Sequence, residues 1–594
     1  MKKLLSLILA VIVVCTSFAA CSTLEKGDKG AVITMYLADE IYDYDPAVGF
    51  TDTATAKFLS LMFEGLTTLD EEGEWQKAMM KSYKYLEPEF EGDTYKLEIT
   101  LRDTKWSDGR TVQANDFVYA WKRIMEPTFK CEAASMLYDL KNAREVKMGD
   151  ASVDDLGVYA IDTYVLQIEF TKDVDLDEFF KNCASVALVP LREDSVSSNK
   201  DWAKRASSMV TNGPYDPRKI DFGKQLTLER SAYYYRDTDS EQALDKYVIP
   251  YRIIVLYNYG DSKAQLEKFE AGSIFYLGEI ALEARKDYSG KAEVRDSAIT
   301  TSLYFNTQNK LFEKKEVRQA LSIALDRQAI AESLVFAKPA TGLVPFGVDD
   351  ANGKGDFRET ADKSAKLIET SANVEEAKSL LKKAGVTSGS FTLSVRDNEA
   401  DVAVAKAVAE TWKSLGFTVK VKELNAVELP ATEKNQSAVY EDKYATAYAA
   451  GDFDVILVDY NVLSPNAFGV LAPFATEYSG NGILLDAQSD KSEKINHITG
   501  YASEAYSKLI DKAYAAEKSE DELAALHDAE KQLLDDMPVI PVVFQQDAYL
   551  ASGELSGIAT TYWGRDFKRT KMKNYMEYKE SIQNELNEDE AEGD

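Results

Sequence analysis

The chain has 594 residues, of which 100 are acidic and 69 are basic, and its formal net charge is −31. This charge argues against a nucleic-acid partner, because phosphate binding needs clustered lysine and arginine. The whole chain contains two histidines, His497 and His527, which argues against histidine-based zinc sites and a Ser-His-Asp triad. The sequence motifs of zinc peptidases, hydrolases and P-loop NTPases are also absent from it. We therefore expect no enzyme, no metal and no cofactor.

The N-terminus has the layout of a secretory signal peptide. Residues 1–3 read MKK, residues 4–20 are mostly apolar and uncharged, and two alanines precede Cys21. The apolar stretch is shorter than the roughly 20 residues of a membrane-spanning helix. A cysteine after small residues resembles a lipobox, so we expect lipidation at Cys21 and a polar tether over residues 21–30. This predicts a domain anchored by lipid to the outer face of the cell membrane, or to its periplasmic face in a cell with two membranes.

The body of the chain alternates predicted strands and helices, which is typical of an α/β fold. Apolar runs and alternation predict strands at 31–38, 94–102 and 164–170, and apolar residues at helical spacing predict helices at 114–125, 314–326 and 373–385. A helix, a turn at Gly416 and a strand are expected within 402–424. Asp326 and Asn373 are predicted helix N-caps, and Gly385 is a predicted helix stop.

Four further segments carry specific expectations. Residues 453–458 predict a buried strand that ends at Asp459, and residues 537–544 (MPVIPVVF) predict a strand whose prolines suit a sheet edge. Residues 577–594 form an acidic tail that we expect to be solvated. Cys131 and Cys183 could pair in an oxidising exterior or remain as buried free thiols.

An ordered set of motifs resembles the extracellular solute-binding proteins of family 5, the peptide-binding components of ABC importers. The set includes TLRDTKWSDGRTVQANDFVYAWKR at 100–123, VTNGPY at 210–215, LYFNTQNKLFEKKEVRQALSIALDRQAI at 303–330 and GDFDV at 451–455. The resemblance spans roughly residues 31–570 and is nearest to the oligopeptide binders. It implies an α/β fold of the type II periplasmic-binding-protein class, with two lobes that close over a ligand and an inserted extra lobe.

The same resemblance implies boundaries for the lobes. Lobe I would consist of residues 31–78, 207–300 and 540–576, lobe II would be the insertion at 79–206, and lobe III would be 301–539. The implied function is that of a monomeric, lipid-anchored binding protein that captures extended oligopeptides and delivers them to the permease subunits of an ABC importer. A receptor of the same fold for a signalling peptide, a modified peptide or another small ligand is the alternative, and a secreted peptidase is a third hypothesis that the missing catalytic motifs argue against.

A receptor for many peptides must recognise what all peptides share. An extended peptide can add as a strand against protein backbone, and its charged ends need an acid for the α-amino group and a cation or helix N-terminus for the carboxylate. The family pattern places the acid in a D-Y pair just past the strand at 453–458. Here the pattern is shortened: aligning the DY pair makes Asp459 the anchor, whereas counting back from Pro465 and Phe468 puts Asn461 in that position. Alternatively, Asp459 only ends the strand and caps the next turn.

Other expected ligand contacts depend on the same resemblance. Tyr460 would be an aromatic wall of the site, or else a core aromatic. Phe50, Thr51 and Asp52 fall where the family places backbone that lines the cleft. Some relatives have a histidine for the far end of the ligand near the start of the helix within 402–424, where this chain has Asp401. Because an acid repels a peptide carboxylate, the ligand-length rule of those relatives does not transfer.

Overall fold

The structure is a computed structural model, and it describes residues 32–37, 41–49, 53–90, 92–234, 248–257, 262–364, 366–429, 439–485 and 492–574. The predicted signal peptide, Cys21, the tether and the acidic tail lie outside these residues, as do Phe50, Thr51 and Asp52. Within the described part of the chain, no helix is both long and apolar enough to cross a bilayer.

One eleven-stranded mixed sheet runs through the molecule. Its strand order is β15 (Phe417–Leu424), β14 (Gly389–Arg396), β18 (Val455–Asn461), β12 (Glu293–Phe305), β21 (Val539–Ala551), β11 (Tyr276–Leu277), β1 (Val32–Leu37), β10 (Arg252–Tyr257), β9 (Gln225–Arg230) and β8 (Tyr215–Asp221), with β13 (Ala337–Pro339) also paired to β21. The strands are rich in valine, isoleucine and leucine, as strands covered on both faces are.

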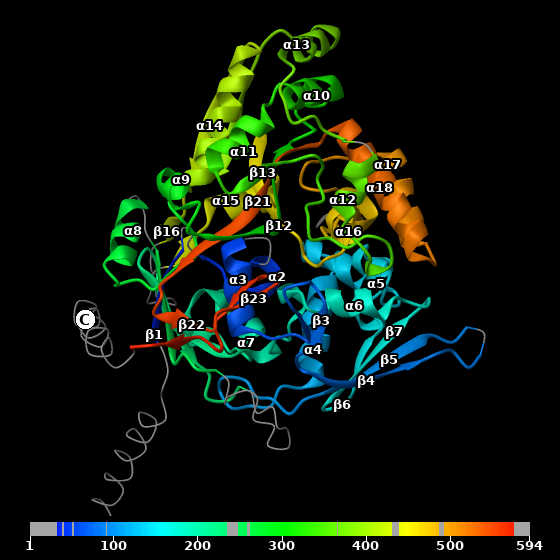
Figure 1. The fold of residues 1–594 in the computed structure, drawn as a ribbon. Coiled ribbons are helices and arrows are strands. Elements are labelled where there is room, and N and C mark those ends of the chain that lie inside the picture. Colours follow the sequence, from blue (N-terminus) through cyan, green and yellow to red (C-terminus); the bar gives the residue numbers. More distant parts are fainter. Residues whose placement is uncertain are drawn as a thin grey trace, which may run out of the picture.

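Strands β12 and β21 join the two ends of this sheet. Each is 13 residues long. The first residues of β12 pair only with β21, whereas its second half also pairs with β18. The pairing between β12 and β21 shifts register between Asp296 and Thr300. The two long strands cross the middle of the molecule in Figure 1, between the helices around α14 (Glu399–Ser414) and the strands around β1.

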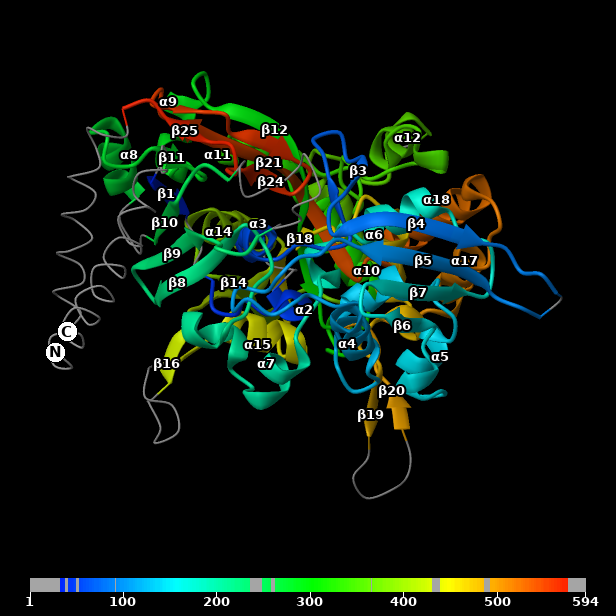
Figure 2. The same ribbon diagram turned by 90° about the horizontal axis from the view of Figure 1, so that it is seen from below.

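A separate four-stranded antiparallel sheet forms from residues of the first third of the chain. Its order is β4 (Met80–Leu86), β5 (Tyr95–Leu101), β7 (Val165–Phe170) and β6 (Val158–Asp162). Helix α4 (Ala114–Met125) buries Phe117, Trp121 and Ile124, and it contacts β6 and β7. Figure 2 shows this sheet on the side of the molecule away from β8 and β9.

Most predicted elements are confirmed, with their caps. Helices α10 (Lys315–Ile323), α11 (Arg327–Leu334) and α13 (Val374–Lys383) occupy the expected segments. The Asp326 carboxylate accepts from Ala329 N, and the Asn373 side chain accepts from Glu376 N. Gly385 ends α13 with a φ of 68°, which favours glycine. Both Cys131 and Cys183 are buried free thiols.

Two expectations about strands were wrong. The strand of MPVIPVVF is not an edge strand, because β21 pairs with β12 on one side and with β11 and β13 on the other. Pro541 is tolerated because it falls at a register irregularity, where Thr301 pairs with Val543 and Ser302 with Pro541. The other strand does not end before Asp459, because β18 runs from Val455 to Asn461. Asp459 therefore lies inside a strand and does not cap a turn.

Candidate functional site

A cavity of about 530 Å³ lies along the middle of the long sheet. Residues of β12, β18 and β21 line it, together with residues of α14, α15 (Lys443–Ala450), α3 (Thr53–Met62) and the hairpin of β23 (Ala559–Thr561) and β24 (Gly564–Asp566). Its charged lining residues are Asp43, Lys57, Lys130, Glu132, Lys204, Glu279, Arg285, Arg295, Arg396, Asp401, Glu441, Asp442, Asp459 and Asp547. The cavity thus gathers both signs of charge from segments distant in sequence.

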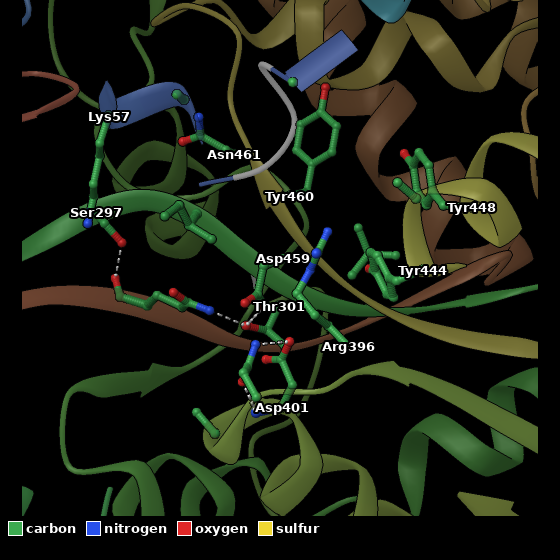
Figure 3. A pocket seen from close by; sticks show the side chains of 18 of the residues that line it. Lys57, Ser297, Thr301, Arg396, Asp401, Tyr444, Tyr448, Asp459, Tyr460 and Asn461 are labelled. Carbon is green, nitrogen blue, oxygen red and sulfur yellow. Dashed lines mark hydrogen bonds between the residues drawn. The ribbon is translucent and has the colours of Figure 1, made fainter. Parts of the chain in front are cut away.

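Asp459 lies in this cavity wall and is held by its neighbours on the sheet. Its Cα is paired with that of Thr301 on β12. The Thr301 hydroxyl donates to Asp459 Oδ1 at 2.6 Å, and Gln545 Nε2 on β21 donates to the Thr301 hydroxyl at 3.0 Å. The hydrogen bonds therefore connect three adjacent strands and fix the carboxyl group in place (Figure 3).

A second acid, Asp401, accompanies Asp459 in the cavity. Asp401 is 7% exposed, near the start of α14, and its Oδ2 accepts from Asn398 Nδ2 at 2.8 Å. Burial raises the pKa of Asp459, while hydrogen bonding with Thr301, Gln545 and Asp401 and the charge of Arg396 oppose the rise. Burial therefore makes Asp459 hold a proton more readily than a free aspartate does.

Arg396 closes this side of the cavity. Its Nη1 lies 3.1 Å from Asp442 Oδ2, and its guanidinium carbon lies 4.3 Å from the centre of the Tyr444 ring. The Tyr444 hydroxyl donates to Leu457 O at 2.7 Å. Arg396 is therefore braced by an ion pair and a cation–π contact, and it moderates the negative charge of the two acids.

Asp459 and Asn461, the two candidate anchors, both line the cavity. Alternate residues of a strand face the same side of a sheet, so the two side chains share one face of β18 and lie one strand repeat apart. Tyr460 also lines the cavity, but it is 5% exposed and its hydroxyl donates to Gly469 O at 3.3 Å. Tyr460 is thus at once a core aromatic and part of the wall.

The expected contacts at Phe50, Thr51 and Asp52 lie outside the described residues, but Gly49 on one side of them and Ala56 on the other line the cavity. Several lining residues were missed by sequence reasoning: Lys57, Arg295, Arg396, Asp547 and Trp563. Among them, Asp547 carries a local signal, because it interrupts the largely apolar strand VVFQQDAYLA. A charge in a buried strand needs a partner, so this position predicts a nearby cation.

The comparisons with known proteins agree with this architecture. Residues 76–482 match the bacterial extracellular solute-binding proteins, family 5. The oligopeptide-binding protein OppA of Bacillus subtilis is 27% identical over 587 residues, which cover 94% of this chain and 97% of that protein. The pheromone receptor PrgZ superposes with a TM-score of 0.76 at 23% identity, covering 91% of this chain and 99% of PrgZ. Peptide-bound OppA of Listeria monocytogenes superposes with a TM-score of 0.75 at 21% identity, covering 91% of this chain and 99% of that OppA chain.

The fold and the central cavity define an extracellular solute-binding protein with the type II binding-protein architecture. The chain belongs to family 5 of the bacterial extracellular solute-binding proteins. This confirms the family and the fold class that the sequence predicts.

Proposed function

We propose that this protein is the solute-binding component of an ABC importer and that it captures extended oligopeptides in the cavity. The observation that carries the proposal is the match to an oligopeptide-binding protein over nearly the full length of both chains. The cavity supports it, because the first residues of β12 pair on one side only, and a buried acid and several cations line the same site. Such a site can pair with a peptide main chain without reading its side chains.

In this proposal Asp459 binds the α-amino group of the peptide. Its carboxyl is fixed by Thr301 at 2.6 Å, and because burial disfavours its ionised form, a ligand ammonium would supply the countercharge that stabilises that form. An ammonium–carboxylate hydrogen bond inside a closed cavity is stronger than one in water. Asn461 is not the anchor in this proposal, because an amide cannot neutralise an ammonium. Since it shares the face of the strand with Asp459, it would instead contact the first residues of the ligand.

The same sheet supports a closing motion of the proposed lobes. We propose the lobes given by the sequence, with residues 31–78, 207–300 and 540–576 closing against 301–539 and residues 79–206 inserted. Strands β12 and β21 are the continuous connections, and the register shift at residues 296–300 is a natural bending point. A peptide that contacts both sides favours the closed form. A lipid on Cys21 would hold the monomeric protein at the membrane, beside the permease.

A receptor for a signalling or modified peptide is the second candidate. The shortened DYN segment at 459–461 favours it, because it leaves both an acid and an amide next to the ligand's first residue. Such a protein would bind peptides whose amino group is blocked. The fold alone does not distinguish the two, since PrgZ and OppA superpose almost equally well.

The test begins with mass spectrometry of the ligand that remains bound through purification. Peptides are the expected result, and a sugar or metal chelate without any peptide would refute the proposed function. Calorimetry then compares peptides from this mixture with their N-acetylated forms. We expect Asp459→Asn to weaken binding of the free amine about 10- to 100-fold, as for loss of a hydrogen bond to a charged group, and Asn461→Ala to change it little. The reverse ranking would make Asn461 the anchor.

A further inference from the structure

Three cations surround one carboxylate at the end of the cavity away from Asp401. Lys57 Nζ lies 3.3 Å from Asp547 Oδ1, while Arg295 Nε and Arg565 Nη2 lie 3.3 Å and 3.4 Å from Asp547 Oδ2. Their charges hold the pKa of Asp547 at about 2. A single carboxylate neutralises only one of the three, so this cluster carries an excess of two positive charges, which is costly in a partly buried place unless an anion joins it.

Two of these cations face the cavity. Lys57 and Arg295 both line it, with 31% and 22% of their side chains exposed. An ammonium has three N–H donors, and among the described residues the Lys57 side chain donates one hydrogen bond, to Asp547. Arg295 already donates to Thr561 O at 2.6 Å. Within the described part of the chain, Lys57 therefore keeps donors that can turn toward a ligand.

A neutral donor adjoins the cluster. Trp563, in the hairpin of β23 and β24, lines the cavity, and its Nε1 is buried with no acceptor among the described residues. The hairpin packs on Lys57: a Cβ at Gly564 would lie 3.4 Å from Lys57 Cγ. A buried indole N–H normally has a hydrogen-bond partner. The residues on either side of Trp563 contact the cluster, since Arg295 Nη2 donates to Tyr562 O at 3.4 Å and Gly564 packs on Lys57. We infer from this that the missing partner is an anionic oxygen.

The next acid on this side of the cavity, Glu279, has a cation of its own. Glu279 lies 3.4 Å from Arg285, which supplies its countercharge. Burial raises the pKa of Glu279, and Arg285 and Lys57 oppose the rise. Asp459 and Glu399 also act on Glu279 and raise its pKa. At Asp547 itself, the three cations Lys57, Arg295 and Arg565 still face one carboxylate.

We propose that Lys57 and the Trp563 indole, with Arg295 behind them, form an anion subsite that binds a carboxylate of the ligand. This proposal deepens the proposed function and depends on it. The carboxylate can be the C-terminus of the peptide or the side chain of an aspartate or glutamate. In either case the subsite lies apart from the two acids: Figure 3 shows Lys57 at a distance from Asp459 and Asp401, which lie close together. Arg295 belongs to the Lys57 side, because both cations pair with Asp547.

The spacing of the two ends limits the length of a ligand held at both termini. Asp459 pairs with Thr301 and Asp547 pairs with Arg295, so the two ends lie six positions apart on β12. At about 3.3 Å per residue this is roughly 20 Å, an upper value because the register shifts in between. An extended peptide covers about 3.3–3.6 Å per residue, so peptides of up to about six residues would be held at both ends.

The experiment offers the ligand-free protein two equimolar mixtures of random tri- to hexapeptides, one with free C-termini and one with C-terminal amides, and identifies the bound peptides by mass spectrometry. We expect capture from the free-acid mixture. From the amide mixture we expect capture to be lost, which identifies the C-terminus as the anion, or to be confined to peptides with aspartate or glutamate, which identifies a side chain. Equal, composition-independent capture from both mixtures would overturn the subsite while leaving peptide binding intact. Capture from neither would refute the proposed function itself.

Variants of Lys57 test the residue directly. Asp547 keeps two arginine partners when Lys57 is neutralised, so we expect Lys57→Gln to fold. The affinity of Lys57→Gln for captured free-acid peptides should fall about 10- to 100-fold. Its affinity for the matching peptides without the carboxylate should not change. Lys57→Arg, which keeps the positive charge, should restore binding of the free-acid peptides. Lys338→Gln is the matched control, because Lys338 also pairs with an acid, Asp296 at 2.7 Å, but does not line the cavity. Equal losses in Lys57→Gln for peptides with and without the carboxylate would contradict the subsite.

Discussion

The Thr301 hydroxyl donates a hydrogen bond to Asp459 Oδ1 at 2.6 Å, directly across the pairing of β12 with β18. The acid that is proposed to bind the ligand amine is therefore positioned by a residue of the strand that also connects the two ends of the sheet. The proposed ligand anchor and the connection between the two ends of the sheet therefore share one hydrogen bond.

Replacing Thr301 by valine keeps the shape of the side chain and removes this donor. Asp459 then loses the bond that stabilises its ionised form, so we expect weaker binding of free-amine peptides, by about 3- to 10-fold in calorimetry. Thr227→Val is the matched control, since Thr227 is a buried strand threonine on β9 that does not line the cavity. An unchanged affinity in Thr301→Val would show that Asp459 needs no support from β12.

Binding of free-amine peptides should depend on pH. The pKa of Asp459 is raised by burial, so its protonation competes with the ligand ammonium at a pH above the usual range of aspartate, near 4. We expect affinity to fall as pH is lowered from 7, and binding in the pH range of this fall to release protons, seen as a dependence of calorimetric enthalpy on the buffer. N-acetylated peptides should show neither effect. The same pH profile in Asp459→Asn would assign the proton to another group.

Glu132, a further acid on the cavity wall, should make stability depend on pH. Its burial raises its pKa to about 7, partly opposed by the Tyr448 hydroxyl at 3.1 Å. Because the folded pKa exceeds the unfolded value of about 4.5, the proton stabilises the fold below pH 4.5, and that stability is lost as pH rises through 7. At pH 8 the loss is about 3 kcal/mol.

Glu132→Gln removes this titration and keeps an acceptor for Tyr448. Thermal unfolding of the ligand-free protein at pH 5 and pH 8 should show a smaller decrease for Glu132→Gln than for the natural chain, and the variant should be the more stable of the two at pH 8. Equal decreases would mean that Glu132 is already ionised or solvated.

Arg358 and Glu530 form a fully buried ion pair that supports the fold. Arg358 Nη2 lies 2.7 Å from Glu530 Oε2, and Glu530 Oε1 also accepts from Leu343 N and Val344 N. Glu530→Ala leaves a buried cation and two backbone donors without this acceptor, so we expect a loss of about 3–5 kcal/mol in urea unfolding. Glu375→Ala, which removes an exposed acid paired with Lys378, should change little. Similar losses of unfolding free energy in both variants would contradict a special stabilising role for the buried Arg358–Glu530 pair.

Local signals predicted most of the elements correctly. Helix α4 has the predicted ends, and the caps at Asp326 and Asn373 are present, because caps and amphipathic faces depend on residues a few positions apart. Strand ends were less predictable. Asp459 looked like a strand end because an acid is costly in a sheet, and the Thr301 hydroxyl that makes it tolerable lies 158 positions away in the chain.

The sequence by itself determined the family, the α/β pattern and the presence of Asp459, Tyr460 and Asn461 in one short strand segment. Only the tertiary structure decided which charges face the cavity. Lys57, Arg295 and Asp547 come from a helix and two strands far apart in the chain, and their ion pairs exist only when β12 and β21 lie side by side. Charge balance depends on distance in space, and no local pattern of residues encodes distances between segments hundreds of positions apart.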